Sequence, residues 1–255
     1  MDFITLTKTN LASEHICCAI AGEKNCQVQA KKSWLAERMA EGLVFKKGNV
    51  RGKCFIEYIP AEYAWAPIAA DGYMYIDCLW VSGKFKGKGY SNQLLNDCIQ
   101  DSQSKGKKGL VILSSPMKKP YLADKHYLEH KGFQQIDAWA PYFELFYLPF
   151  TAHSIPAPRF ASSVTKFSGV SSGFVLYYTS QCPFTAKYVP LVEQLAREKN
   201  VPFHSIHLQN RTEAHQAPTP YTSYSLFYNG VFVTHEILSE KSFRKILTKL
   251  VPTAV

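Results

Sequence analysis

The chain has 255 residues, 46% of them apolar and 14% aromatic, which is typical of a globular protein with a sizeable core and one or two domains. No run approaches the roughly 18 consecutive apolar residues of a membrane-spanning helix. The N-terminus lacks the basic start and apolar block of a signal peptide. We therefore expect a cytoplasmic protein with no membrane partner.

The net charge of +9 is spread over the whole chain. Residues 151–255 carry ten Lys/Arg and five Asp/Glu, or +5, which leaves +4 for residues 1–150. A nucleic-acid-binding surface needs clustered basic residues, and no long basic run occurs, so a nucleic-acid partner is not favoured. A basic surface also suits a small polyanionic ligand.

The seven cysteines are odd in number and form no C-x-x-C pair. Most of them lie in apolar segments, which indicates reduced core thiols rather than a disulfide framework. His15 lies near Cys17 and Cys18, but this spacing matches no zinc motif, and we expect no metal site.

The first part of the chain alternates between strand and helix patterns. The helix expected at 27–41 contains Trp34 and Leu35 and stops at Gly42. A second helix is expected at 12–21, and strands are expected at 3–7, 43–47, 52–59 and 73–81.

A loop rich in Gly and Lys follows the last of these strands and opens into an amphipathic helix. Glycines bring backbone N–H groups close to a ligand, and the helix N-terminus adds partial positive charge. Lys84, Lys86 and Lys88 add full charges. The segment therefore predicts a phosphate or pyrophosphate site, although its spacing fits neither a P-loop nor a dinucleotide-binding fingerprint.

Downstream, Gly109 to Ser114 reads as a buried strand, and a helix then closes with Y-L-E-H-K-G-F at 127–133. Strands are expected at 133–138 and 142–150. Residues 151–172 are rich in Ser, Pro, Ala and Gly, which predicts a linker. After it we expect strands at 174–178, 202–208, 224–228 and 231–234, helices at 186–198 and 239–250, and a hairpin turn at Asn229-Gly230.

The motif Lys84-x-x-Gly87-x-Gly89 resembles the acyl-CoA pyrophosphate loop of the GNAT N-acetyltransferases, written [RQ]-x-x-G-x-[GA]. Lys replaces the usual Arg or Gln at the first position. The order of strand, Gly loop, helix, strand, helix, Gly-Phe and strand also matches the core of that family. The resemblance implies an α/β fold with a mixed sheet and a GNAT domain over residues 1–150.

The same resemblance implies acetyl-CoA as co-substrate and direct transfer of its acetyl group to a primary amine. The backbone of Leu79, Trp80 and Val81 would bind the pantetheine arm. The pyrophosphate would lie on the loop, for which the resemblance gives Lys84, Lys86, Gly87, Lys88, Gly89 and Tyr90.

The reaction needs a base for the ammonium proton and an acid for the departing thiolate. Asp77, next to the loop, is the natural base, with Glu57 as the alternative, and a purely structural Asp77 is also open. Tyr127 matches the family's acid, although it lies one residue further from Gly132 than the commonest spacing. Tyr121 is a further possibility.

The second half, residues 173–255, resembles a thioredoxin fold and, with the first half, the YoaP-like domain of YoaP-type acetyltransferases. In that comparison Cys182 occupies the position of the first cysteine of the thioredoxin C-x-x-C motif. Pro218 or Pro220 would occupy the position of the cis-proline. A cysteine at a helix N-terminus is expected to have a lowered pKa, and Thr185 could hydrogen-bond its thiolate.

The leading hypothesis is an acetyl-CoA-dependent N-acetyltransferase. The alternative is a non-catalytic or redox-linked module that binds CoA or thiols through Cys182, and a vestigial turn at Cys182 is also open. The sequence identifies neither the amine acceptor, which can be a small molecule or a peptide, nor the oligomeric state.

Overall fold

A computed structural model describes residues 1–19, 21–151, 156–165 and 172–251. The helices are α1 Cys26–Arg38, α2 Tyr90–Ser104, α3 Lys125–His130, α4 Thr185–Glu198, α5 Arg211–Gln216 and α6 Glu240–Leu250. The strands are β1 Phe3–Thr5, β2 Val44–Gly48, β3 Cys54–Pro60, β4 Ile68–Ala69, β5 Met74–Val81, β6 Gly109–Ser115, β7 Ala123–Asp124, β8 Gln134–Trp139, β9 Phe143–Pro149, β10 Arg159–Phe160, β11 Phe174–Tyr178, β12 Phe203–His207, β13 Tyr224–Tyr228 and β14 Val231–Thr234.

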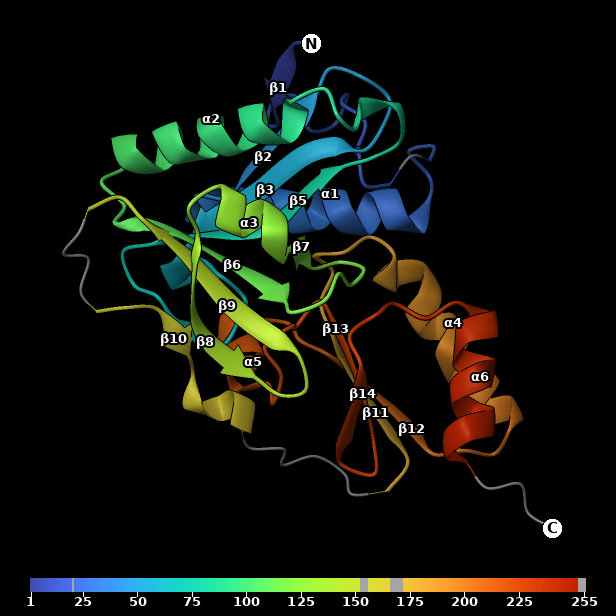
Figure 1. Cartoon of the computed structure of the whole chain (residues 1–255). Coiled ribbons are helices and arrows are strands. Elements are labelled where there is room, and N and C mark those ends of the chain that lie inside the picture. The colour runs from blue at the N-terminus through green and yellow to red at the C-terminus, as the bar shows by residue number, and fades with distance from the viewer. Residues whose placement is uncertain (20, 152–155, 166–171, 252–255) are drawn as a thin grey trace.

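The main sheet contains eight strands in the order β1-β2-β3-β5-β6-β9-β8, and β7 pairs with β6 (Figure 1). The β5–β6 and β6–β7 pairs are parallel and the other pairs are antiparallel. The predicted α/β fold with a mixed sheet is therefore confirmed.

Helices cover both faces of this sheet. On one face, α2 and α3 bury Leu94, Leu95 and Leu128 against alternate residues of β3, β5 and β6. On the other face, α1 buries Trp34 and Leu35 (Figure 1). Helix α1 begins at the cap Asn25, whose side chain accepts a hydrogen bond from Gln27 N, and the following 3-10 turn ends at Gly42 with φ +92°.

The second half forms a four-stranded sheet in the order β12-β11-β13-β14, with α4 and α6 packed on one face (Figure 1). The opposite face contributes Val175, Tyr177 and Phe227 to the same core cluster that contains α1. The two sheets therefore share one continuous core. The predicted hairpin joins β13 to β14, with positive φ at both Asn229 and Gly230.

Two expectations about local structure were wrong, and one helix was missed. Residues 12–19 form turns rather than a helix, because Ile16 to Ala19 are all buried and four consecutive residues cannot share one helix face. Helix α5 was not predicted. Among the described residues, the cis peptide bond lies at Ala140-Pro141 and not before Pro218 or Pro220.

The described part of the predicted linker packs on the first half. Strand β10 pairs with β4, and the Phe160 N–H donates to Asp137 Oδ2 over 2.8 Å. Trp139 Nε1 donates to the Val164 carbonyl, also over 2.8 Å. Residues 152–155 and 166–171 of the predicted linker lie outside the described residues. Within the described ranges, no helix combines the length and apolar character needed to cross a bilayer.

Candidate active site

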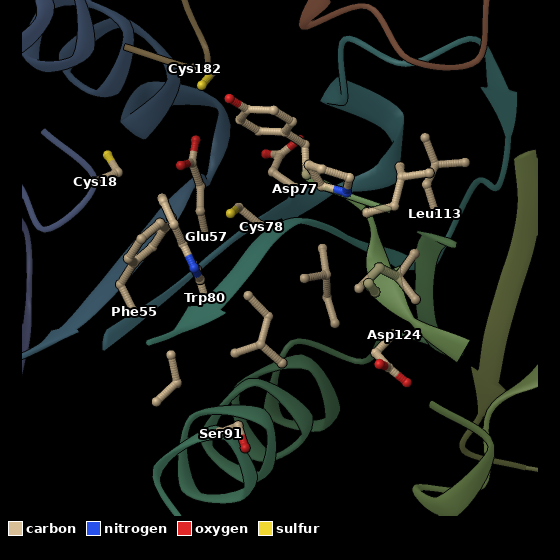
Figure 2. A pocket seen from close by; sticks show the side chains of 18 of the residues that line it. Cys18, Phe55, Glu57, Asp77, Cys78, Trp80, Ser91, Leu113, Asp124 and Cys182 are labelled. Carbon is tan, nitrogen blue, oxygen red and sulfur yellow. The ribbon is translucent and has the colours of Figure 1, made fainter. Parts of the chain in front are cut away.

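A cavity of about 570 Å³ lies between the open end of the main sheet and the C-terminal half. One end of its wall is the Gly loop and the start of α2. The other end contains Glu57, Asp77 and Cys78 from the main sheet, with Cys182 facing them from the C-terminal half (Figure 2).

The cavity begins where two neighbouring strands separate. Strand β5 pairs with β6 only from Met74 to Ile76, although β5 continues to Val81. On its other edge, β5 stays paired with β3 up to Val81. Within the part of the chain that the structure describes, residues 77–81 therefore present a strand edge without a paired strand on the cavity side, and Leu79, Trp80 and Val81 all line the cavity. Such an edge can accept an extended amide-bearing chain as an additional strand.

The Gly loop has the backbone geometry of an anion site. Gly83, Gly87 and Gly89 have φ of +62°, +72° and +78°, which favours glycine. The first N–H groups of a helix have no intrahelical acceptor. Gly89, the N-cap of α2, has no side chain to cap them, so they can donate to a ligand. Apart from the adjoining residues, no described part of the chain lies within 4 Å of the position that a Cβ would take at Gly87 or Gly89, which leaves room for a ligand.

The loop residues contribute unequally to the cavity. Lys86, Gly87, Gly89 and Tyr90 line the wall, together with Ser91 from the first turn of α2. Lys84 and Lys88 are exposed and do not line it, and the Lys84 ammonium lies 5.5 Å from the centre of the Phe85 ring. The structure therefore brings four of the six predicted loop residues to the cavity.

At the other end, a β-bulge determines which side chains enter the cavity. Glu57 faces Cys78 and Tyr58 faces Ile76, so Asp77 is the extra residue of the bulge. Because of this extra residue, Asp77 and Cys78 lie on the same face of the sheet, the face that also carries Glu57 (Figure 2).

Glu57 is held by two buried donors. Its Oε2 lies 2.5 Å from Lys31 Nζ, and its Oε1 accepts a hydrogen bond of 3.2 Å from Trp34 Nε1. Both charged side chains are only 1% exposed. Lys31 Nζ also donates to the Gln181 carbonyl over 2.6 Å, so the ion pair reaches the C-terminal half.

Asp77 differs from Glu57 because no cation of the described residues lies within 4 Å of its carboxylate, and no hydrogen bond within that part of the chain holds it. Burial raises the pKa of Asp77 well above its usual range, and the negative charge of Glu57 adds to this effect. Lys31 lowers the same pKa in part. A carboxylate of this kind holds a proton more readily than an ordinary Asp.

The two candidate acids lie in different parts of the wall. The Tyr127 hydroxyl, on α3, is buried and forms no hydrogen bond within the described residues, although Ser91 lies close enough to lower its pKa slightly. Overall, burial raises the pKa of Tyr127. Tyr121 lines the cavity in a left-handed conformation with φ +66°, and burial raises its pKa to about 12.

The expected lowering of the Cys182 pKa was wrong. Burial raises it to about 11, and the backbone N–H of Phe184 and the charge of Lys31 only partly oppose this. Thr185 does not bond the thiol, because its hydroxyl donates to the backbone carbonyls of Thr179 and Cys182 over 3.0 and 2.8 Å. The side chain nevertheless lines the cavity.

Several wall residues were not found from the sequence. Cys78 is adjacent to Asp77, but only the bulge turns it to the same face. Lys31 lies in the middle of a predicted helix, and a buried lysine has no local signal. Tyr221 and Ser223 lie about 140 residues from Asp77 and reach the cavity only through the packing of the two halves.

Comparisons with known proteins show what the chain is similar to. A family model described as YoaP-like matches residues 202–245. The protein named "Uncharacterized N-acetyltransferase YoaP" of Bacillus subtilis (strain 168) is 43% identical over 251 residues, which cover 98% of this chain and 100% of that protein.

Solved structures resemble the chain more distantly. A ribosomal-protein-alanine N-acetyltransferase from Brucella melitensis is 13% identical, with a TM-score of 0.42, and covers 58% of this chain and 99% of its own. The PaiA N-acetyltransferase from Thermoplasma acidophilum, solved with coenzyme A, is also 13% identical, with a TM-score of 0.39. The similarity covers 59% of this chain and 100% of that protein's chain. Similarity at this level carries no argument, and the family assignment rests on the Bacillus subtilis relative.

Proposed function

Since the chain belongs to the family of the YoaP N-acetyltransferases, we propose that it transfers the acetyl group of acetyl-CoA to a primary amine by direct attack. The observation that carries this proposal is the unpaired edge of β5, which runs from the bulged Asp77 to the Gly loop along one cavity. A cofactor with an anionic head and an amide-bearing arm fits an anion site that continues into an open strand edge.

The pyrophosphate of acetyl-CoA is assigned to the backbone of Gly87 to Tyr90 at the start of α2. Lys86 adds a charge at the wall, whereas Lys84 and Lys88 attract the polyanion from the exposed side of the loop. The pantetheine amides are assigned to the edge of Leu79 to Val81. This arrangement directs the thioester toward the bulge at Asp77.

Asp77 is proposed as the base that removes the proton from the ammonium. The raised pKa of Asp77 lies closer to the pKa of an amine than the pKa of an ordinary Asp does, which makes Asp77 the better base. Glu57 is proposed to keep this environment in place, because both of its oxygens already accept hydrogen bonds from Lys31 and Trp34.

Tyr127 is proposed as the proton donor to the departing CoA thiolate. Its buried hydroxyl has no hydrogen-bond partner in the described residues, and its raised pKa keeps it protonated. Attack of the amine nitrogen on the thioester carbonyl forms the C–N bond and breaks the C–S bond. Asp77 takes one proton from the ammonium before the attack. After the attack the nitrogen loses a second proton, which replaces the proton that Tyr127 gives to the sulfur, so CoA leaves as the thiol and one proton is released.

We also propose that the C-terminal half is a thioredoxin-like unit that has lost dithiol chemistry and acts in the cytoplasm as part of this enzyme. The sheet order β12-β11-β13-β14 and Cys182 at the start of α4 support this, and the trans bonds at Pro218 and Pro220 depart from it. A thiol with a pKa of about 11 is protonated at neutral pH, which does not favour the redox-linked alternative.

The test is to incubate the protein with acetyl-CoA and a panel of primary amines and to detect N-acetylated product by mass spectrometry. We expect product from at least one amine in wild type and none above background in the Gly87→Asp, Gly89→Asp double variant. Tight acetyl-CoA binding without product from any amine would favour a non-catalytic CoA-binding module.

A further inference from the structure

The C-terminal half completes the wall opposite the carboxylates. Gln181, Cys182 and Phe184 from the loop before α4, and Tyr221 and Ser223 from the segment before β13, line the same cavity as Asp77. We call these five residues the roof.

The roof is fixed to the first half by hydrogen bonds. Lys31 Nζ donates to the Gln181 carbonyl over 2.6 Å, and Ser223 Oγ donates to Gln181 Oε1 over 2.8 Å. Next to Ser223, the Thr222 hydroxyl donates to the Trp65 carbonyl. His235, which is fully buried, bonds the Tyr142 hydroxyl and the Pro120 carbonyl, each over 2.8 Å. Hydrogen bonds between the two halves therefore hold the roof over the carboxylates.

The charges of the wall admit one ammonium group. Glu57 is paired with Lys31. Asp124 caps α3 by accepting a hydrogen bond from Tyr127 N and lies 3.5 Å from Lys118. Of the three carboxylates that line the cavity, Asp77 alone has no cation of the described residues within 4 Å. Lys86 and Lys119, which have no carboxylate of the described residues within 4 Å, also line the cavity and would repel a second positive charge.

Aromatic side chains form a large part of the wall. Tyr75, which is 6% exposed, Tyr121, Tyr221 and Phe184 all line the cavity. Aromatic rings pack against apolar groups and attract a cation over their faces.

Resting on the proposed acetyl transfer, we propose that the acceptor is a small primary monoamine with an aromatic or apolar body, bound under the roof with its ammonium at Asp77. Polyamines are disfavoured by the positive charges of Lys86 and Lys119, and a lysine on a folded protein is disfavoured because the roof encloses Asp77 from the side opposite the sheet.

The test measures amine binding by calorimetry at about pH 8, with and without CoA, using phenethylamine, spermidine and a lysine-containing peptide as probes. We expect phenethylamine to bind at least tenfold more tightly than the other two. Asp77→Asn should weaken phenethylamine binding by about 30-fold, because a desolvated charge pair is lost. Tyr221→Leu, which keeps an apolar side chain but removes the ring, should weaken it by about fivefold.

Tyr63→Ala, which removes an aromatic ring that is 47% exposed at the surface, is the matched control and should bind as wild type does. Circular dichroism of each variant checks that it is folded. Tighter binding of spermidine or the peptide, no binding of phenethylamine, or unchanged binding in Asp77→Asn would each overturn the proposal. A parallel titration with acetyl-CoA separates this result from the proposed function, which fails only if acetyl-CoA does not bind or no amine is acetylated.

Discussion

The two ends of the cavity are built in different ways. The Gly loop and strand edge of the cofactor end come from one continuous stretch, from Leu79 in β5 to Ser91 in α2, with Tyr127 of α3 beside Ser91. The geometry of this stretch depends on backbone conformation. The acceptor end is assembled from α1, β3, β5, the loop around Tyr121 and two loops of the C-terminal half. A site made by local backbone can be recognised in the sequence, whereas a site made by distant side chains requires the fold.

The largest expected effect lies at the acceptor end. Asp77→Asn removes the proposed base and should lower kcat by about 10²–10⁴-fold, the range typical of a lost general base. Acetyl-CoA binding should not change, because the loop is untouched. Steady-state kinetics with the best amine measure the first effect, and calorimetry measures the second.

Two controls accompany this variant. Asp71→Asn, an exposed carboxylate on the loop before β5, should keep wild-type activity. Thermal unfolding of Asp77→Asn at neutral pH should occur at or above the wild-type temperature, because a group whose pKa is raised in the folded state costs stability when it is ionised. An Asp77→Asn enzyme with wild-type kcat would remove Asp77 from the mechanism.

The next effect concerns the buried ion pair. Glu57→Gln leaves the Lys31 ammonium buried without its anion, and it should lower the free energy of unfolding by about 3 kcal/mol. Adding Lys31→Met to the same chain removes the unpaired charge and should restore most of the loss. Urea unfolding of the three proteins measures this, and equal stability of wild type and Glu57→Gln would show that the pair is not structural.

The pH dependence of activity sharpens the contrast between Asp77 and an ordinary carboxylate. The base works only when it is deprotonated, so kcat should rise with pH through the pKa of Asp77. Because that pKa is raised, the rise should occur well above pH 4, where an unperturbed Asp titrates. The remaining activity of Asp77→Asn should lack this rise, and a rise that persists in the variant would assign it to another group.

The smallest effect is expected at Cys182. Its thiol is protonated at neutral pH, so Cys182→Ser should change kcat by less than about twofold and leave the pH profile unaltered. Alkylation of Cys182 by iodoacetamide, followed by mass spectrometry, should be slow near pH 7. A large loss of turnover, or rapid alkylation, would show that the Cys182 thiol is functional.

The sequence predicted the elements around the loop well because local signals determine them. Gly42 ended the helical segment after α1, and Asn229-Gly230 formed the hairpin. Strands β5 and β6 lie close to their expected ranges, and α2 follows the Gly loop as expected. The errors came from tertiary context. Ile16 to Ala19 are apolar because they fill a core, and this pattern was interpreted as part of a helix.

The acceptor end was only partly predicted for the same reason. Asp77 and Glu57 were found because they lie on neighbouring strands beside the loop. The bulge, the Lys31 pair and the roof were missed, since each depends on contacts between segments far apart in the chain. The pKa of Cys182 was predicted in the wrong direction because burial outweighs the helix N-terminus.

The most direct test of the account is a calorimetric titration of acetyl-CoA into wild type, the Gly87→Asp, Gly89→Asp double variant and Gly106→Asp. Gly106 also has positive φ, at +67°, and open space around it, but it follows the far end of α2, so this variant matches the backbone strain without touching the site. We predict micromolar binding to wild type and Gly106→Asp, and none to the double variant. Equal binding to all three would contradict the placement of the cofactor.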